Sequence, residues 1–160
     1  MQKQVTAAIA GLGSRGKDVY APMSRLFPEK LKITAVADPD PSRAMQMREE
    51  YRIEEGQVLW KRGGDAGAAR LADVMIIATQ DRQHVRQAVR AMERGYDILL
   101  EKPVSPELDE CGRCQKAEEL KRKVVVCHVL RYTPFYQTVK SLLDAGRIGE
   151  VVSVMAVENV

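Results

Sequence analysis

The sequence predicts an α/β protein: a doubly wound parallel sheet with helices on both faces. Two observations predict this class. Short strand-like segments alternate along the chain with segments of helical periodicity, which is typical of βαβ units. The strand-like segments are apolar along almost their whole length, as strands covered on both faces are. With 160 residues, 45% of them apolar and 29% charged, the chain can bury the core of an ordinary domain.

Five segments read as buried strands: residues 5–11, 31–38, 72–79, 96–101 and 124–130. Residues 57–60 are a weaker candidate, and residues 151–160 read as a final strand. Between the strands, residues 83–95 place apolar side chains on one helical face and end on Gly95, which suits the position after a helix. Three further helices are expected to begin at a capping residue followed by proline: Asp40–Pro41, Ser105–Pro106 and Thr133–Pro134.

The pattern changes near residue 130. We expect a dinucleotide-binding domain over residues 1–130, followed over 131–160 by a linking helix and the first strand of a second α/β domain that the chain does not complete. A strand with no partner downstream should favour association between chains.

Composition narrows the partners. A net charge of +3 with scattered lysines and arginines does not indicate nucleic acid or a membrane surface. No apolar stretch approaches the roughly 20 residues needed to span a bilayer. Three cysteines provide no disulfide framework, so we expect a cytoplasmic protein.

A glycine motif follows the first strand. Gly11, Gly13 and Gly16 have the G-x-G-x-x-G spacing, and a helix is expected directly after them. In that context the glycines provide a tight turn, close approach to a pyrophosphate and tight helix–strand packing. The N-terminus of the helix favours phosphate, and Arg15 could add a cation. The motif therefore predicts a Rossmann dinucleotide site.

Asp38 ends the second strand, 22 residues after Gly16. An acid at about this distance holds the adenosine ribose hydroxyls. Since a carboxylate there repels a 2′-phosphate, we expect NAD to be preferred, although Arg43 nearby keeps NADP open as a cofactor.

A charged pair, Glu101 and Lys102, ends the strand at 96–101, and Pro103 follows. Ligands of doubly wound sheets lie at the carboxyl ends of strands, so this pair should face the nicotinamide half of the dinucleotide. The carboxylate suits ribose hydroxyls. The ammonium suits a substrate oxygen whose charge changes during hydride transfer.

These motifs together resemble one family. G-L-G-S-R-G, V-A-D-P-D, "IIATQDRQH", "ILLEKPVSP" and "HVLRYTPFYQTVKSLLDAGRIGEVVSV" are similar to segments of the Gfo/Idh/MocA oxidoreductases, and the resemblance covers the whole chain. It implies a Rossmann domain followed by an open-sheet α/β domain. It also implies hydride transfer between NAD and a sugar, polyol or cyclitol hydroxyl, and a homo-oligomer formed through the C-terminal domain of the full-length protein.

The resemblance assigns roles to individual residues. The phosphate turn would consist of Gly11, Gly13 and Gly16, with backbone contacts from Leu12, Ser14 and Arg15. Asp38 would hold the adenosine ribose, and Glu101 the nicotinamide ribose. Lys102 would be the catalytic or substrate-orienting lysine, also beside the cofactor.

Four further expectations come from the same resemblance. Thr79 and His84 would lie near the cofactor, although Gln80 replaces the usual proline of that segment. Arg131 would line the cofactor cleft, and the Lys102–Pro103 peptide would be cis. The acid/base partners of Lys102 would lie past Val160, so this chain should bind NAD without turnover.

No metal site is expected. Cys111 and Cys114, with Cys127 and His128, would make a four-ligand zinc set. However, Cys111 and Cys114 recur with Leu108 and Ala117 every third residue, which indicates core packing instead. His128 itself fits a packed core position or a cleft position equally well. The aromatic residues Tyr132, Phe135 and Tyr136 are also expected to pack in a core.

Two other functions stay open. Some relatives of this family are glycosidases that use NAD transiently, oxidising one carbon so that elimination can follow. A non-catalytic dinucleotide-binding module is the second, but a lysine at the hydride end argues against it.

Overall fold

The structure, a computed structural model, describes residues 3–59 and 70–157. The chain divides into two compact units, Met1–Cys127 and His128–Val160. The boundary lies three residues before the expected one at 130/131. Each unit is described below by itself.

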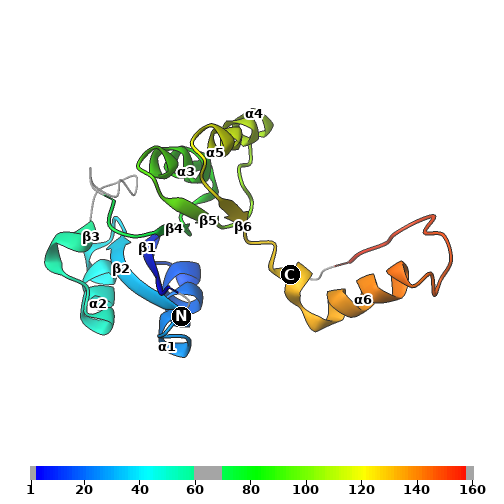
Figure 1. The fold of residues 1–160 in the computed structure, drawn as a ribbon, viewed down its shortest axis with the longest axis horizontal. Coiled ribbons are helices and arrows are strands. Elements are labelled where there is room, and N and C mark those ends of the chain that lie inside the picture. Colours follow the sequence, from blue (N-terminus) through cyan, green and yellow to red (C-terminus); the bar gives the residue numbers. More distant parts are fainter. Residues whose placement is uncertain (1–2, 60–69, 158–160) are drawn as a thin grey trace. The chain divides into compact units, whose positions relative to one another are not determined.

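The first unit is built on one parallel sheet of six strands in the order β3-β2-β1-β4-β5-β6 (Figure 1). The strands are β1 Val5–Ala10, β2 Leu31–Ala37, β3 Val58–Leu59, β4 Val74–Ile77, β5 Asp97–Leu100 and β6 Val124–Val126. The chain runs outward from β1 to β3 and then returns to β4 on the other side of β1. This reversal is the point at which ligands bind in doubly wound sheets. The predicted fold class is confirmed.

The six strands fall within the six segments that the sequence predicted. Their ends are shorter than expected, most of all for residues 124–130. There the strand stops at Val126, and a 3₁₀ turn follows at Val129–Tyr132. The weak candidate at 57–60 is β3, and its residue 60 lies outside the described residues.

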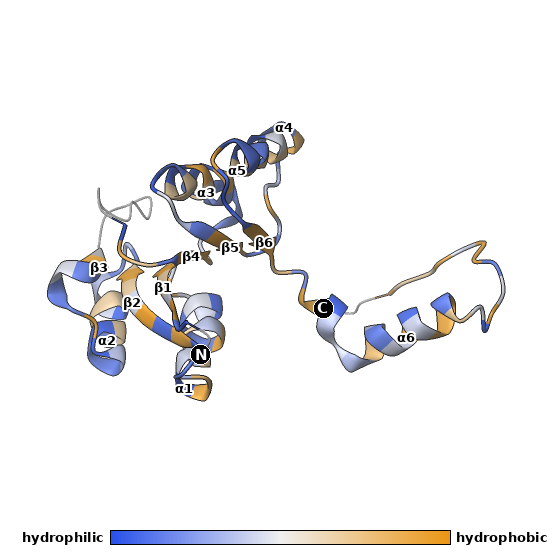
Figure 2. Cartoon of the chain, in the orientation of Figure 1, coloured by the Kyte–Doolittle hydropathy of each residue, from blue (hydrophilic) through white to orange (hydrophobic). Residues whose placement is uncertain are grey.

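Helices cover both faces of the sheet (Figure 1). On one face lie α1 (Met23–Leu26) and α2 (Pro41–Tyr51), and on the other α3 (His84–Glu93) and α5 (Lys116–Glu119). Each face has its own buried apolar cluster. The strands are the most hydrophobic segments and the helices the more polar ones, as two-sided burial requires (Figure 2).

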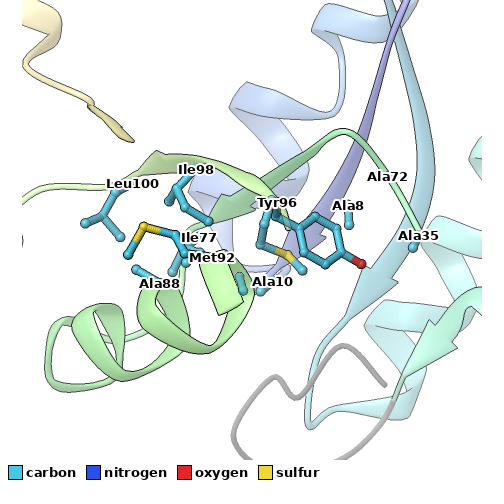
Figure 3. Packing of buried hydrophobic residues seen from close by; sticks show 12 residues of the cluster. Ala8, Ala10, Ala35, Ala72, Ile77, Ala88, Met92, Tyr96, Ile98 and Leu100 are labelled. Atoms are coloured by element: carbon cyan, nitrogen blue, oxygen red, sulfur yellow. The ribbon is translucent and has the colours of Figure 1, made fainter. Parts of the chain in front are cut away.

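The cluster under α3 is shown in Figure 3. Ala88 and Met92 of α3 point toward Ile77 of β4 and Leu100 of β5. The ring of Tyr96 is fully buried, and its hydroxyl accepts a hydrogen bond from the backbone N–H of Leu71. Large buried side chains therefore pack α3 against β4 and β5, the strands next to residues 101–103.

Two predicted helix signals agree with the structure. Asp40 caps α2 by accepting a hydrogen bond from the backbone N–H of Ser42 at 2.9 Å, and Pro41 is the first helical residue. Gly95 follows α3 with a φ of 90°, in the left-handed region that glycine favours.

The single helix predicted over 105–121 is wrong. The structure has α4 (Leu108–Cys111), a 3₁₀ turn (Gly112–Gln115) and α5 instead. Gly112 lies at the interruption, and glycine costs about 1 kcal/mol relative to alanine inside a helix. Ser105 does not cap a helix; its hydroxyl accepts from the backbone N–H of Glu107 and donates to the carboxylate of Glu110. Leu108, expected in the core, is 87% exposed.

The helix after the glycine motif is also interrupted. Residues Ser14–Tyr20 form a π-helical turn, and α1 begins only at Met23. Pro22 lies between them, and proline has no N–H with which to continue the backbone ladder. This short turn brings Tyr20 to the sheet edge described below.

The second unit contains α6 (Pro134–Asp144), which begins after Thr133 as expected. The Thr133 hydroxyl donates to the carbonyl of Leu130. The final strand predicted over 151–160 is wrong for its described part, because residues 151–157 have no strand structure. A strand needs a neighbour for its backbone hydrogen bonds, and no strand of the described ranges pairs with these residues.

The core packing expected for three aromatic residues of this unit is not observed. Tyr132, Phe135 and Tyr136 are 73%, 69% and 45% exposed. Phe135 and Tyr136 contact each other edge to face, with ring centroids 5.1 Å apart.

A polar connection closes the amino edge of the sheet in the first unit. One carboxylate oxygen of Asp73 accepts hydrogen bonds from the backbone N–H and the hydroxyl of Thr6, at 3.0 and 2.9 Å. These bonds lower the pKa of Asp73, the backbone bond most. They join the start of β1 to the start of β4, opposite the glycine motif. Within the described ranges, no helix is long and apolar enough to cross a bilayer.

Candidate functional site

The glycine turn lies at the carboxyl end of β1, and two of its glycines are required by contacts inside the protein. A Cβ on Gly11 would lie 2.5 Å from the carbonyl oxygen of Ala78, and the φ of Gly11 is 89°. A Cβ on Gly16 would lie 1.9 Å from the carbonyl oxygen of Gly11. A real Cβ cannot approach an oxygen so closely, so both positions need glycine.

Gly13 differs from the other two. A Cβ added there would meet nothing within 4 Å. Its lack of a side chain leaves open space in front of the backbone, where a pyrophosphate would approach. The turn therefore fits a dinucleotide by its shape, with two glycines that build it and one that leaves it accessible.

Asp38 follows β2 and is buried, with 4% of its surface exposed. One carboxylate oxygen accepts from the backbone N–H of Leu12 at 2.7 Å, and the other from the backbone N–H of Asp40 at 2.9 Å. The carboxylate thus joins the glycine turn to the loop after β2. Each oxygen has a second lone pair, so the carboxylate can still accept from a ribose hydroxyl.

A pocket of about 150 Å³ lies between these elements. Its lining comprises Gly11, Gly13, Asp38, Pro39, Arg43, Ala78, Thr79, Gln80 and Gln83. It is smaller than the ~300 Å³ or more of an ordinary ligand pocket, so it suits one part of a dinucleotide. Arg43 forms an ion pair with Asp40, with 3.5 Å between Nε and Oδ2. Hydrogen bonds from Ser42 lower the pKa of Asp40, which keeps this partner of Arg43 charged.

Thr79 lines the same pocket. Its hydroxyl donates to the side-chain oxygen of Gln87 at 2.6 Å, and the amide of Gln87 donates to Gln83. Gln80, which replaces a proline expected from the resemblance, begins a tight turn in which the N–H of Gln83 donates to its carbonyl. The turn is therefore held by backbone and amide hydrogen bonds.

His84 was expected beside the cofactor, and that contact stays a prediction. Its side chain is 1% exposed. The Nδ1 atom lies 2.7 Å from the carbonyl oxygen of Pro103, and Nε2 lies 3.0 Å from the carbonyl oxygen of Thr79. Both nitrogens face protein carbonyls, so the ring joins the Thr79 turn to the Pro103 turn.

Glu101 and Lys102 lie just past the carboxyl end of β5. The backbone N–H of Glu101 donates to the carbonyl of Ile77, which extends the sheet by one residue. Glu101 is 6% exposed, whereas the Lys102 side chain is exposed. The Lys102–Pro103 peptide is cis, as the resemblance led us to expect.

Three residues around Glu101 were not predicted to act together. The hydroxyl of Tyr20 lies 2.6 Å from one Glu101 oxygen and 2.9 Å from the sulfur of Cys127. Arg15, expected beside the phosphates, has its Nε atom 3.6 Å from the same Glu101 oxygen. Tyr20 is 81 residues from Glu101 and 107 from Cys127 in sequence. No local motif could have signalled contacts of this range.

Comparison with known proteins identifies the family. Residues 5–129 match the family model described as "Oxidoreductase family, NAD-binding Rossmann fold", GFO_IDH_MocA. The chain belongs to this family. The prediction of the Gfo/Idh/MocA family, with its NAD cofactor, is confirmed.

Curated relatives in this family include two bacterial inositol dehydrogenases. A scyllo-inositol 2-dehydrogenase (NAD(+)) of Bacillus subtilis is 32% identical over 94% of this chain and 43% of its own length. An inositol 2-dehydrogenase of Corynebacterium glutamicum is 29% identical over 94% of this chain and 44% of its own length. The chain thus spans less than half the length of these relatives.

Solved structures show the same fold. A scyllo-inositol dehydrogenase from Lactobacillus casei with bound NAD(H) and scyllo-inositol superposes with a TM-score of 0.81 at 23% identity. The alignment covers 92% of this chain and 43% of that one.

The cofactor and substrate contacts that the resemblance assigns to single residues stay predictions. Arg131 lies in the 3₁₀ turn Val129–Tyr132 of the second unit, and its cofactor contact is untested. The absence of zinc is likewise a prediction. Over residues 3–59 and 70–157, no three His, Cys, Asp or Glu side chains lie together as a metal site would require.

Proposed function

We propose that this chain is the NAD-binding part of an oxidoreductase that transfers hydride between a nicotinamide and a secondary alcohol of a polyol, sugar or cyclitol. The observation that carries the proposal is the placement of Glu101 and Lys102. They follow β5 at the carboxyl edge of the sheet, the edge at which the glycine turn follows β1. The inositol dehydrogenase names of the relatives support a cyclitol in particular.

The adenosine half of NAD would be held at the first part of this edge. The backbone from Gly11 to Gly16, with Leu12, Ser14 and Arg15, would contact the phosphates. Asp38 would accept from the adenosine ribose, and Thr79 would line the pocket beside it. Because the Asp38 carboxylate is buried and already accepts two backbone hydrogen bonds, its position is fixed before the cofactor arrives.

The nicotinamide half would be held at residues 101–103. The Glu101 carboxylate would accept from the nicotinamide ribose. NAD, when bound, supplies the hydride acceptor. Lys102 would orient the substrate oxygen with its ammonium and stabilise the charge that this oxygen gains when its proton leaves. Its exposed side chain is free to reach such an oxygen: among the described residues, the Lys102 ammonium forms no ion pair.

The proposal also covers Arg131, the oligomeric state and the cellular location. Arg131 would line the cofactor cleft, and the full-length protein would form homo-oligomers through its C-terminal domain. The three cysteines, all free thiols in the structure, support a cytoplasmic location.

Calorimetric titration of the chain with NAD tests the proposal. We expect saturable binding that Gly13→Ala weakens without loss of folded structure. Hydride transfer is then measured by NADH absorbance in a longer protein that contains this chain, with inositols and other polyols as substrates. There, Lys102→Met should abolish turnover and leave the NAD dissociation constant within about twofold. Full turnover by Lys102→Met would refute the role of the lysine.

A further inference from the structure

We propose that Tyr20 is a positioning residue of the nicotinamide half of the site: its hydroxyl, supported by the thiol of Cys127, fixes the Glu101 carboxylate that receives the nicotinamide ribose. This inference rests on the proposed function. It assigns a role to a tyrosine that lies outside every motif of the sequence.

The proton count in this cluster fixes the direction of each hydrogen bond. A tyrosine hydroxyl has one proton, yet it lies within hydrogen-bonding distance of both Glu101 and Cys127. A carboxylate is the stronger acceptor of the two, and its bonds to neutral donors are short. At 2.6 Å, the Tyr20 hydroxyl therefore donates to Glu101.

The Cys127 thiol is then a donor to Tyr20. With the phenol proton committed to Glu101, we assign the S–H of Cys127 as the donor to the phenol oxygen, with 2.9 Å between oxygen and sulfur. Burial raises the pKa of Cys127, so the thiol keeps its proton. Burial, followed by the bond to Glu101, also raises the pKa of Tyr20 far above its usual range. Both donors are therefore protonated at neutral pH, and the chain runs from Cys127 through Tyr20 to Glu101.

The other side of the carboxylate is held as well. Its second oxygen accepts from the backbone N–H of Lys102 at 3.0 Å, and the Nε atom of Arg15 lies 3.6 Å from the oxygen that Tyr20 contacts. Arg15 is half exposed, so its contribution is screened by water. Tyr20 is thus the close, partly buried donor that sets the rotation of this carboxylate.

Fixing the carboxylate matters for binding and for the reaction. An oriented acceptor loses little conformational entropy when a ribose hydroxyl donates to it. The same carboxylate bonds the backbone N–H of Lys102, so its rotation also affects the peptide from which the lysine side chain begins. Removal of the Tyr20 hydroxyl should therefore weaken the nicotinamide half of the cofactor site and leave the adenosine half unchanged.

The test compares NAD with ADP, which lacks the nicotinamide and its ribose. We expect Tyr20→Phe to weaken NAD binding by about 2- to 10-fold, the range of one net hydrogen bond, and to leave ADP binding unchanged. Tyr51→Phe is the matched control, because it removes a hydroxyl from a half-buried tyrosine at the end of α2 and should change neither ligand. Equal weakening of NAD and ADP by Tyr20→Phe would overturn the proposal.

A double-mutant cycle tests whether Tyr20 acts through Glu101. If it does, Tyr20→Phe combined with Glu101→Gln should bind NAD no more weakly than Glu101→Gln alone. Additive losses would contradict the proposed route. A second pair of variants keeps the test valid if the tyrosine variant folds poorly. Cys127→Ala should weaken NAD binding, as Tyr20→Phe does. Cys127→Ser, which keeps a hydrogen-bond donor, should bind NAD more tightly than Cys127→Ala.

The outcomes separate the two proposals. Tight NAD binding by the unmodified chain, with no change in Tyr20→Phe, removes the role of Tyr20 and leaves the NAD site standing. If the unmodified chain binds neither NAD nor ADP, the proposed function fails, and the role of Tyr20 fails with it.

Discussion

The Nδ1 atom of His84 lies 2.7 Å from the carbonyl oxygen of Pro103. His84 begins α3, and Pro103 belongs to the turn after β5, so this contact ties the residues that follow Glu101 to a helix start. The other ring nitrogen faces the carbonyl of Thr79, which lines the pocket beside Asp38. A neutral imidazole has one N–H and can donate to only one of the two carbonyls at a time. The ring therefore connects the two halves of the candidate site.

Replacement of His84 should destabilise the protein. We expect His84→Ala to lower the free energy of unfolding by about 1–3 kcal/mol, because it leaves a part-buried carbonyl oxygen without its donor and removes a fully buried ring. Urea unfolding followed by circular dichroism measures the change. His128→Ala is the control, since the second of the two histidines is exposed and its loss should cost less than about 0.5 kcal/mol. Equal stability of the two variants would show that the His84 contacts contribute nothing.

Mutation of Gly11 should reduce stability, whereas mutation of Gly13 should reduce NAD affinity. Gly11→Ala forces a Cβ against the Ala78 carbonyl at a φ of 89°, so we expect a loss of about 2 kcal/mol or more in unfolding free energy. Gly13→Ala enters open space and should leave stability nearly unchanged, while NAD affinity falls by about tenfold or more. Unfolding curves and NAD titrations of both variants test this. Normal NAD binding by Gly13→Ala would place the phosphates elsewhere.

Asp38 should make the chain prefer NAD over NADP. A buried carboxylate at the pocket repels a 2′-phosphate, and Arg43, the cation beside it, is paired with Asp40. We expect Asp38→Ser to reduce the ratio of NAD affinity to NADP affinity by about tenfold. Asp40→Asn should reduce this ratio less, by releasing Arg43 from its ion pair. Calorimetry with both cofactors measures the ratio. Tighter binding of NADP by the unmodified chain would contradict this assignment.

Acid should remove the stabilisation that Asp73 provides. Hydrogen bonds from the backbone and side chain of Thr6 lower the pKa of Asp73 in the folded state. Its contribution is therefore complete above the unfolded-state value of about 3.9 and is lost as the pH falls through the folded-state pKa. Asp73→Asn should cost about 1 kcal/mol at pH 7, and the difference from the unmodified chain should shrink below about pH 4. A constant difference from pH 7 to pH 2 would exclude this linkage.

Local sequence patterns predicted the fold and the placement of several candidate site residues at one edge of the sheet. Apolar runs predicted the strands, because two-sided burial requires them, and Asp40–Pro41 marked the start of α2 correctly. The placement of Gly11, Asp38 and Glu101 at one edge was predicted because each follows a strand, and parallel strands bring their carboxyl ends to one edge.

Long-range contacts set the limit of that reasoning. A histidine at a helix start can be exposed or buried, and the sequence does not distinguish the two. Only the contacts of His84 with Thr79 and Pro103 show that it is buried. The partnership of Tyr20 with Glu101 depends on how a π-helical turn ends, and that depends on Pro22. The sequence did not predict the break at Gly112, because the Ser105–Pro106 start signal favours one continuous helix after it.

The Thr6–Asp73 connection lies at the amino edge of the sheet, whereas the glycine turn, Asp38 and Glu101 lie at the carboxyl edge. Protein engineers can use this division. A mutant library restricted to the amino edge would sample variants of expression yield and heat tolerance while cofactor preference stays constant. A library at the carboxyl edge would sample new cofactor and substrate choices, provided that Gly11 and Gly16, which the turn itself requires, are kept. The two libraries could be selected separately and their best members recombined, since the two edges lie at opposite ends of the strands.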